Sequence, residues 1–265
     1  MQNKLERIKK YSDLEKRTWD QVFLSEIKNT SNKKFSSYWW EYYYDQLTTC
    51  ITSIVDNSSN LKVLEAGSGS GKATFLSFPK SRITLLDISS NALTAAKKLA
   101  LAYSIKNVTY IEGNMFSMPF NDSLFDLVWN IGTVEHYDED LVHDMLSEML
   151  RVAKPKAFVA IAIPNFKSMP IKKAKILSAP ILNRVFKFLP GYRLATEKSY
   201  TPQDIERIFK LVTNKDGSEL VNIKTFFLGS PLFVGTPKPL INFVSRFEYM
   251  VEKRKFLILI IANKS

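Results

Sequence analysis

The sequence predicts an α/β fold with a doubly wound, seven-stranded and mostly parallel sheet. Three observations support this prediction. Short apolar runs of strand length alternate with helix-like segments from residue 60 onward. A glycine-rich turn, within LEAGSGSGK at residues 64–72, follows the first apolar run. Asp87 then ends the second run about twenty residues beyond that turn, where doubly wound folds place an acid that accepts hydrogen bonds from a ribose.

Length and composition are those of a globular protein with one main domain. The 265 residues are 45% hydrophobic and 24% charged, which is ordinary for a soluble domain. The single cysteine, Cys50, has no internal partner for a disulfide and indicates a reducing compartment. The amino terminus lacks the apolar segment of a signal peptide, and the longest apolar run, residues 256–262, is too short to span a bilayer. We therefore expect a cytoplasmic protein.

The net charge of +11 is concentrated in one segment. Residues 166–198 contain eight basic residues and one acid, whereas residues 61–165 contain ten basic and eleven acidic residues. A uniformly basic surface would favour nucleic acid as a partner, and this distribution favours a local cationic patch instead. Nucleic acid is therefore not an expected partner.

The glycine-rich turn is compatible with one of three cofactor loops. A phosphate-binding P-loop needs glycine where Ala66 stands and Ser or Thr after Lys72, but Ala73 follows. The dinucleotide fingerprint would place its third glycine on Lys72. The pattern that remains is E-x-G-x-G-x-G, formed by Glu65, Gly67, Gly69 and Gly71.

This pattern resembles motif I of the class I S-adenosylmethionine-dependent methyltransferases. The resemblance implies S-adenosylmethionine as the cofactor, with the glycine backbone packed against its amino acid and ribose portions. It also implies that Glu65 serves the amino group of the cofactor, directly or through water. A glycine-rich structural turn in some other α/β domain is the alternative that the loop alone leaves open.

The next two strands extend the expected cofactor site. Strand 82–87 follows a short helix over residues 73–78 and ends at Asp87, whose carboxylate can accept from both ribose hydroxyls, with Ile88 beside it. A helix over residues 90–103 leads to strand 108–112 and then to Asn114, where family members commonly have Asp. The amide oxygen of Asn114 can still accept from the adenine amino group, and Met115 would contact the adenine ring. A plain turn is the alternative for Asn114.

The fourth strand, residues 125–130, leads into IGTVEH at residues 131–136. This segment resembles the small-molecule methyltransferases of the quinone-biosynthesis group, which implies that Asn130 and Ile131 lie beside the sulfonium. Glu135 and His136 would then begin the next helix at the mouth of the cleft, as the catalytic candidates. The Asp/Asn-Pro-Pro-aromatic sequence of adenine amino methylation is missing here, and Cys50 is wrongly placed for cytosine methylation.

His136 also has two other interpretations. With Asp140 and His143 it recurs at helical spacing and would share one helix face, but two histidines without a third converging segment do not predict a metal. As a general base it would take the proton of a substrate hydroxyl, because histidine titrates in the physiological range. Otherwise it is a polar residue at a helix start.

The segment of residues 166–198 follows strand 157–163, and Pro155 is expected to stop the helix before that strand. It combines the cationic excess with a dense apolar stripe, and its prolines divide it into two short helices. We expect a helical lid that touches an anionic substrate or a membrane surface. A lid that packs its stripe on the core, with lysines in solvent, is the alternative.

Four further elements complete the expected domain, residues 60–265. They are a helix over residues 202–211 with a capping box at Thr201, a strand over 221–228, and a helix over 239–251 before the final strand 256–262. The family resemblance implies that this last strand is antiparallel.

Residues 1–59 are expected to form a helical amino-terminal extension, which in similar methyltransferases often covers the cleft. Its aromatic cluster, residues 38–44, would stack on a substrate ring or, as we favour, pack the extension onto the core.

The expected function is methyl transfer from S-adenosylmethionine to a small-molecule acceptor, lipid-like or anionic, by in-line displacement at the sulfonium. An RNA methyltransferase and a non-catalytic cofactor-binding module are the alternatives. Peripheral membrane contact through residues 166–198 is also expected. The acceptor and the oligomeric state are not determined by the sequence.

Overall fold

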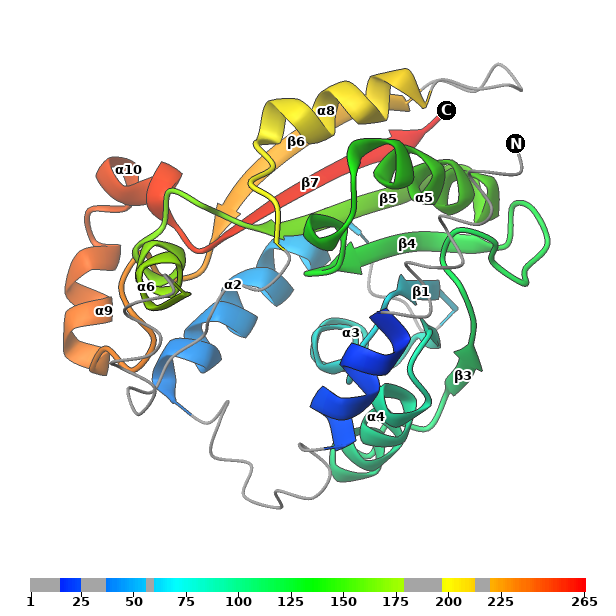
Figure 1. The fold of residues 1–265 in the computed structure, drawn as a ribbon, viewed down its shortest axis with the longest axis horizontal. Helices are drawn as coiled ribbons and strands as arrows, with labels where there is room; N and C mark the ends of the chain where they lie inside the picture. Colours follow the sequence, from blue (N-terminus) through cyan, green and yellow to red (C-terminus); the bar gives the residue numbers. More distant parts are fainter. Residues whose placement is uncertain (1–14, 25–36, 56–59, 179–196, 213–219) are drawn as a thin grey trace.

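The computed structural model of the protein describes residues 15–24, 37–55, 60–178, 197–212 and 220–265. Within these residues a single seven-stranded sheet has the order β3-β2-β1-β4-β5-β7-β6, and β7 alone runs opposite to the other six strands (Figure 1). The strands are β1 Lys62–Ala66, β2 Arg82–Asp87, β3 Val108–Glu112, β4 Phe125–Ile131, β5 Ala153–Pro164, β6 Leu220–Leu228 and β7 Leu257–Lys264. The predicted fold class and the antiparallel last strand are confirmed.

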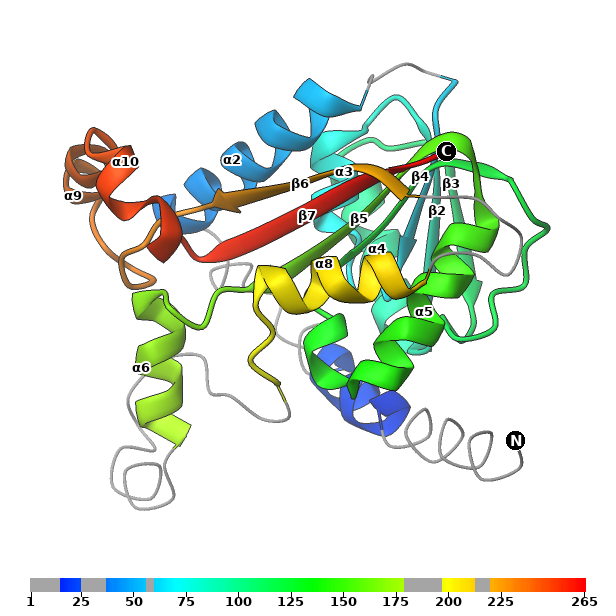
Figure 2. The same ribbon diagram turned by 90° about the horizontal axis from the view of Figure 1, so that it is seen from above.

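Helices cover both faces of the sheet (Figure 2). They are α2 Tyr38–Ile54, α3 Lys72–Ser77, α4 Ser90–Ala102, α5 Glu139–Val152, α6 Met169–Ser178, α8 Pro202–Leu211, α9 Lys238–Ser245 and α10 Glu248–Val251, with the 3-10 turns η2 Val134–His136 and η3 Glu252–Arg254. Residues 15–24 form a further helix. The predicted capping box at Thr201 is present. The Thr201 hydroxyl accepts from the Asp204 backbone N–H, and the Asp204 carboxylate accepts from the Thr201 backbone N–H.

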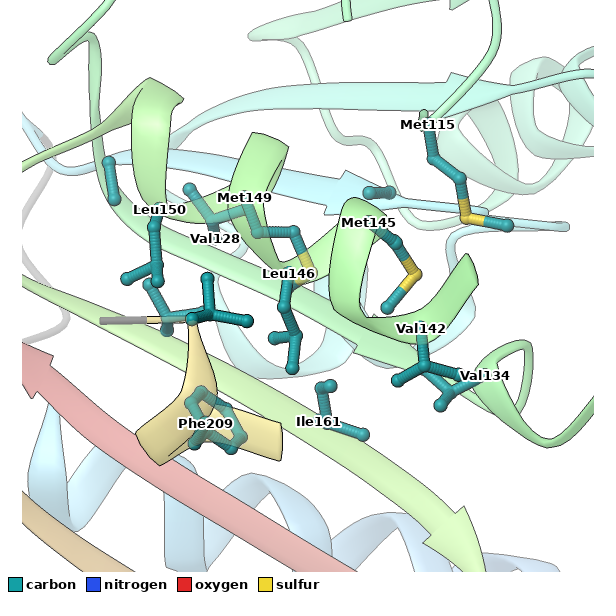
Figure 3. Close-up of a cluster of buried hydrophobic side chains, with 14 of the residues drawn as sticks. Met115, Val128, Val134, Val142, Met145, Leu146, Met149, Leu150, Ile161 and Phe209 are labelled. Carbon is teal, nitrogen blue, oxygen red and sulfur yellow. The ribbon is translucent and has the colours of Figure 1, made fainter. Parts of the chain in front are cut away.

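The face covered by α5 and α8 holds the larger hydrophobic core (Figure 3). Leu146 and Met149 of α5, Phe209 of α8 and Ile161 of β5 are all fully buried there. Burial of each such side chain stabilises the fold by about 1.5–3 kcal/mol. Met115, which follows β3, lies at the edge of the same cluster and joins this core to the carboxyl ends of the strands.

The helix α2 packs on the opposite face of the sheet. Trp39, Tyr43, Leu47 and Ile51 recur every four residues, lie on one side of the helix and are buried against the strands. The rings of Trp39 and Tyr43 are stacked at 6.2 Å. For these two aromatic residues the packing interpretation is therefore correct, and α2 is an integral part of the core.

The predicted helix boundaries differ from the structure at two places. The helix α5 ends at Val152 without help from Pro155, which lies inside β5 where the pairing with β4 is irregular between Ala153 and Phe158. Such an irregularity accommodates proline, because a residue there does not have to donate an N–H to the neighbouring strand. The helix expected over residues 239–251 is divided into α9 and α10.

The expected lid is only partly described. Its first short helix corresponds to α6, with Pro170 in the first turn, where its missing N–H has no helical partner to lose. The second helix lies outside the described residues. The boundary between the extension 1–59 and the domain 60–265 likewise remains a prediction.

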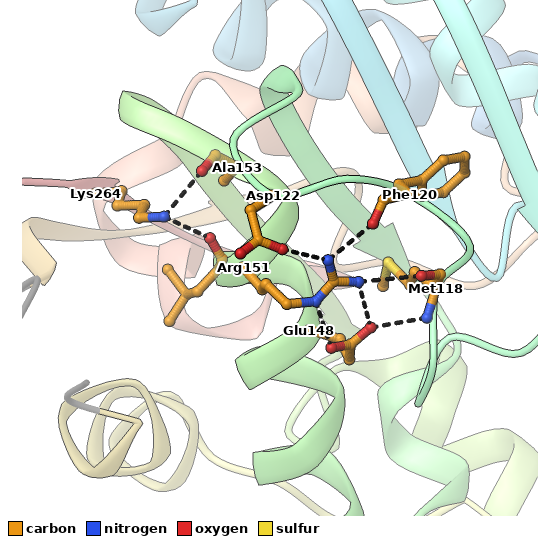
Figure 4. A network of polar contacts seen from close by, with 8 residues as sticks. Met118, Phe120, Asp122, Glu148, Arg151, Ala153 and Lys264 are labelled. Carbon is orange, nitrogen blue, oxygen red and sulfur yellow. Dashed lines mark hydrogen bonds and ion pairs between the residues drawn. The ribbon is translucent and has the colours of Figure 1, made fainter. Parts of the chain in front are cut away.

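A network around Arg151 fixes the segment that follows β3 (Figure 4). Its guanidinium donates to the backbone oxygens of Met118 and Phe120 and to the carboxylates of Asp122 and Glu148. Glu148 in turn accepts from the Met118 backbone N–H at 2.7 Å. The loop between β3 and β4 is thus bound to α5, which fixes the chain just after Asn114 and Met115.

Candidate functional site

A cavity of about 200 Å³ lies at the carboxyl ends of β1, β2, β3 and β4. In open α/β sheets ligands bind at this edge, because the loops that leave the strands there diverge around a crevice. Each of the four strand ends contributes lining residues, and the helix of residues 15–24 contributes two more. The strand ends predicted from the sequence therefore meet at one place.

The glycine turn after β1 forms the floor of the cavity. Gly67 and Gly69 line it with φ angles of 71° and 52°, values that disfavour residues with a side chain. A Cβ on Gly67 would also lie 2.9 Å from the Thr133 hydroxyl. Gly71 does not line the cavity; it is the N-cap residue just before α3, and a Cβ there would lie 2.5 Å from Leu85. The first two glycines therefore shape the cavity, and the third brings α3 close to β2.

Asp87 lies at the end of β2 and lines the cavity together with Ile88. Its Oδ2 accepts from the Gly69 backbone N–H at 2.7 Å and its Oδ1 from the Ser89 backbone N–H at 2.8 Å. Burial raises the pKa of this carboxyl, and the two hydrogen bonds act against that rise. Each carboxylate oxygen has a second lone pair, so Asp87 can still accept hydrogen bonds from a ligand.

Asn114 and Met115 line the cavity from the end of β3. The amide oxygen of Asn114 accepts from the Phe116 backbone N–H at 2.9 Å, which holds the turn that aims Met115 inward. Phe116 is a further lining residue, and its ring meets that of Tyr137 edge-on at 5.1 Å. This side of the cavity is thus mainly apolar.

The end of β4 places Ile131 at the cavity and Asn130 behind the glycine turn. The Asn130 amide donates to the Ala66 carbonyl oxygen, while its own oxygen is buried without a hydrogen-bond partner among the described residues. The hydroxyl of Ser68, which lines the cavity, has no such partner in the described part of the chain either. Two polar atoms at the glycine turn therefore have unused hydrogen-bonding capacity.

Glu65 is not among the residues that line the cavity. Its carboxylate is buried and accepts at 2.6 Å from the hydroxyl of Thr74, which in turn accepts from the indole N–H of Trp129. Burial raises the pKa of Glu65 to about 8, although the Thr74 hydrogen bond lowers it. The Glu65 carboxylate is therefore held by Thr74 of α3, and its direct contact with a ligand remains a prediction.

Glu135 and His136 lie in the turn η2 and precede α5, which begins at Glu139. Glu135 is buried, and its Oε2 has no partner among the described residues. Burial raises its pKa to about 8. The expectation that these residues begin the helix is wrong, because α5 starts three residues beyond His136. His136 therefore does not share a helix face with Asp140 and His143.

His136 is buried beside the cavity without lining it. Its ring meets the indole of Trp19 edge-on at 5.5 Å, and its neighbour Tyr137 does line the cavity. Burial lowers the pKa of His136, and the nearby carboxylates of Glu197 and Glu15 counteract this. The net shift is downward, so the imidazole is neutral at physiological pH.

Trp19 and Phe23 line the cavity from the helix of residues 15–24. Phe23 is so close to the turn that a Cβ on Gly69 would meet its ring at 3.1 Å. The helix is bound to the loop after β2, since the Ser89 hydroxyl donates to Asp20 at 2.5 Å and the Asn91 amide donates to the Asp20 carbonyl oxygen.

Sequence reasoning did not single out Trp19, Phe23 or Thr133. The available signal for the first two was an aromatic pair at i and i+4 in a segment rich in charged residues. Thr133 lies inside the IGTVEH segment, lines the cavity and donates to the Gly67 carbonyl oxygen at 3.2 Å.

The described residues hold neither a candidate metal cluster nor a candidate membrane span. In that part of the chain, no three His, Cys, Asp or Glu residues gather closely enough to hold a metal ion. Of the helices in the described ranges, none combines the length and the apolar character needed to cross a bilayer.

The central part of the chain is similar to known sequences. Residues 63–156 match the family model described as a methyltransferase domain. A demethylmenaquinone methyltransferase of Bacillus cereus is 29% identical over 156 residues, which cover 57% of this chain and 65% of the relative. The match therefore spans slightly less than two thirds of that relative's length.

Solved structures share the fold at low identity. The magnesium protoporphyrin IX methyltransferase of Synechocystis, solved with bound SAH, has a TM-score of 0.59 and 14% identity, and 96% of this chain and 99% of that chain are covered. The cyclase SpnF has a TM-score of 0.62 and 14% identity, with 96% of each chain covered. At such identities the likeness shows a common fold and not a common reaction.

Proposed function

We propose that the protein transfers a methyl group from S-adenosylmethionine to a small-molecule acceptor, because residues 63–156 match the family model described as a methyltransferase domain. The observation that carries this proposal is the convergence of Gly67, Asp87, Asn114 and Ile131 on one cavity from four successive strand ends. Each of these residues stands where the resemblance to class I methyltransferases implies a contact with the cofactor.

The residues around the cavity fit S-adenosylmethionine. The Asp87 carboxylate has lone pairs left for ribose hydroxyls, and Ile88 and Met115 offer apolar contact to an adenine ring. The amino acid portion of the cofactor is polar and needs partners near the glycine turn. The Ser68 hydroxyl and the Asn130 amide oxygen, both without partners among the described residues, supply hydrogen-bonding capacity there.

When bound, S-adenosylmethionine supplies a methyl group on a sulfonium, which is already activated for transfer. The chain's own residues then have to hold the acceptor in line with that methyl group and keep water out. Trp19 and Phe23, from the helix of residues 15–24, are suited to the second task because their rings line the cavity with apolar surface.

We propose His136 and Glu135 as the catalytic candidates because they adjoin the cavity, although neither lines it. The neutral imidazole of His136 can accept the proton of an acceptor hydroxyl. Glu135, with a pKa of about 8, is largely protonated at neutral pH and is therefore suited to donate a hydrogen bond that orients the acceptor. Both lie between Thr133 and Tyr137, which line the cavity.

The acceptor that we propose is an apolar, lipid-like molecule with a hydroxylated ring. Two observations support this. Trp19, Phe23, Phe116 and Tyr137 give the cavity an aromatic wall. The Bacillus cereus relative is named for methylation of demethylmenaquinone.

The test is a transfer assay with S-adenosylmethionine labelled in its methyl group. The acceptors are a demethylated naphthoquinol with a prenyl side chain and, separately, unmodified tRNA, and the label is followed into each product by mass spectrometry. Label on the naphthoquinol, lost in Asp87→Ala, supports the proposal. Label on tRNA alone would assign an RNA methyltransferase. Cofactor binding by calorimetry without label on either acceptor would favour a non-catalytic module.

A further inference from the structure

The outer face of α9 is apolar, which is unusual for a helix at the surface. Ile241 anchors α9 in the core. Leu240 and Phe243, three residues apart on α9, are 48% and 56% exposed, and Phe247, just beyond the end of α9, is 47% exposed. A helix at the surface of a soluble domain normally turns polar residues outward. The solvent-exposed side of α9 thus carries large apolar side chains of the kind normally found in a core.

The apolar surface continues into α10. Tyr249 and Met250 are 94% and 77% exposed, and the rings of Phe243 and Phe247 meet edge-on at 5.3 Å. We call Leu240, Phe243, Phe247, Tyr249 and Met250 the α9–α10 patch. Large side chains gathered in this way mark an interaction surface, whereas single exposed apolar residues do not.

Cations surround the α9–α10 patch. Lys238, Arg246, Lys253 and Arg254 belong to the same segment and are exposed, against two glutamates at positions 248 and 252. The helix α6 lies at the same end of the molecule as α9 and α10 in both views (Figures 1 and 2). Residues 166–178, which include α6, contain four lysines and no acid, and Lys173 lies 5.8 Å from the ring of Phe233 in the loop before α9.

We propose that the α9–α10 patch, with the lysines of α6, binds an anionic lipid surface. Aromatic and long apolar side chains enter the boundary between headgroups and acyl chains, and each nearby lysine or arginine adds electrostatic attraction to an anionic membrane. A second copy of the chain is a poorer occupant, since pairing through this face would bring like charges together.

The position of the patch gives membrane binding a use. The helix α6 follows the carboxyl end of β5, the strand next to β4, so the cationic side of this surface starts from the same edge of the sheet as the cavity. When the protein is bound to the membrane through this surface, that edge of the sheet would lie close to the bilayer. Membrane binding itself does not depend on the proposed function; only the delivery of a lipid-like acceptor rests on it.

The test is flotation of the full chain with vesicles of phosphatidylglycerol and phosphatidylcholine, compared with vesicles of phosphatidylcholine alone. The apolar variant is Phe243→Ser with Phe247→Ser, and its matched control is Leu101→Ser, since Leu101 is 80% exposed on α4. The charge variant is Lys172→Gln with Lys175→Gln, and its control is Lys98→Gln with Lys106→Gln, all four being exposed lysines.

We expect the wild-type chain to float with the anionic vesicles only. Each patch variant should need about tenfold more lipid for half-binding, while both controls bind like the wild type. The proposal is overturned if the chain ignores both kinds of vesicle, binds them equally, or keeps its affinity in the phenylalanine variant. A dimer that Phe243→Ser and Phe247→Ser dissociate, seen by ultracentrifugation without vesicle binding, would assign the patch to a second copy.

Cofactor affinity is measured by calorimetry on the same preparations. Unchanged cofactor binding in the patch variants shows that they are folded. Loss of flotation in a folded variant can then be attributed to the altered surface. The flotation result does not depend on the outcome of the methyl transfer assay.

Discussion

The backbone N–H of Gly69 donates a 2.7 Å hydrogen bond to the carboxylate of Asp87. This contact joins the turn after β1 to the end of β2, and the second carboxylate oxygen is held by the Ser89 backbone N–H. The Asp87 side chain is therefore fixed in place before any ligand arrives. Such preorganisation reduces the entropy that binding has to overcome.

Replacing Asp87 by Ala should weaken binding of S-adenosylhomocysteine by about ten- to a hundredfold, because hydrogen bonds to a charged group contribute about 1.5–3 kcal/mol. Isothermal titration calorimetry measures the change. Asp126→Asn is the matched control, since Asp126 also accepts from a backbone N–H, that of Lys62, but does not line the cavity. Equal losses in both variants would mean that Asp87 acts through stability alone.

Gly71→Ala should destabilise the fold more than Gly235→Ala. Both glycines have positive φ angles, 67° and 90°, so both substitutions introduce backbone strain. Only at Gly71 does the new Cβ meet a neighbour, Leu85 at 2.5 Å, and overpacking adds about 1–3 kcal/mol. Urea unfolding gives the two free energies, and similar values would show that Leu85 moves aside at little cost.

The unfolding free energy should fall between about pH 4.5 and pH 8 because of Glu65. Its pKa is raised from 4.5 to about 8, so in this range the folded protein keeps a proton that the unfolded chain releases. One such group lowers stability by about 1.4 kcal/mol per pH unit. Glu135 acts in the same direction.

Glu65→Gln should make this dependence shallower, as measured by urea unfolding at several pH values across the range. Glu139→Gln is the control, because the Arg207 hydrogen bond lowers the pKa of Glu139 and places its titration below the range. An unchanged slope in Glu65→Gln would contradict a protonated Glu65.

His136→Ala should lower kcat by about a hundredfold with cofactor affinity nearly unchanged, because only the proton transfer is lost. His143→Ala is the control; its side chain is 42% exposed on α5, and neither quantity should change. Turnover at the wild-type rate in His136→Ala would remove this residue from the reaction.

Trp19→Ala should weaken cofactor binding by about tenfold, because the indole covers the cavity, and Trp19→Phe should restore part of the affinity. Arg17→Ala, on an exposed side of the same helix, should leave binding unchanged. If Trp19→Ala binds the cofactor like the wild type, the helix of residues 15–24 does not close the site.

Strands and their ends were predictable because they depend on local patterns. The apolar runs of β2 and β3 are bounded as the sequence indicates, at Asp87 and Glu112. Parallel strands bring their carboxyl ends to one edge, so residues that follow different strands converge there without further information. Gly67, Asp87, Asn114 and Ile131 meet at the cavity for this reason.

The direction of a buried side chain was not predictable, because neighbours distant in sequence decide it. Glu65 turns toward Thr74 and Trp129, and η2 separates His136 from α5.

The sequence by itself determined the α/β fold, the glycine turn and the strand ends that form the cavity, since hydrophobic periodicity and glycine torsions act locally. Only the tertiary structure decided that Trp19 and Phe23 cover that cavity and that Phe243 and Phe247 face solvent. Removing an aromatic side chain from water lowers the free energy at any apolar surface. The sequence pattern of aromatic residues therefore does not specify which surface they contact.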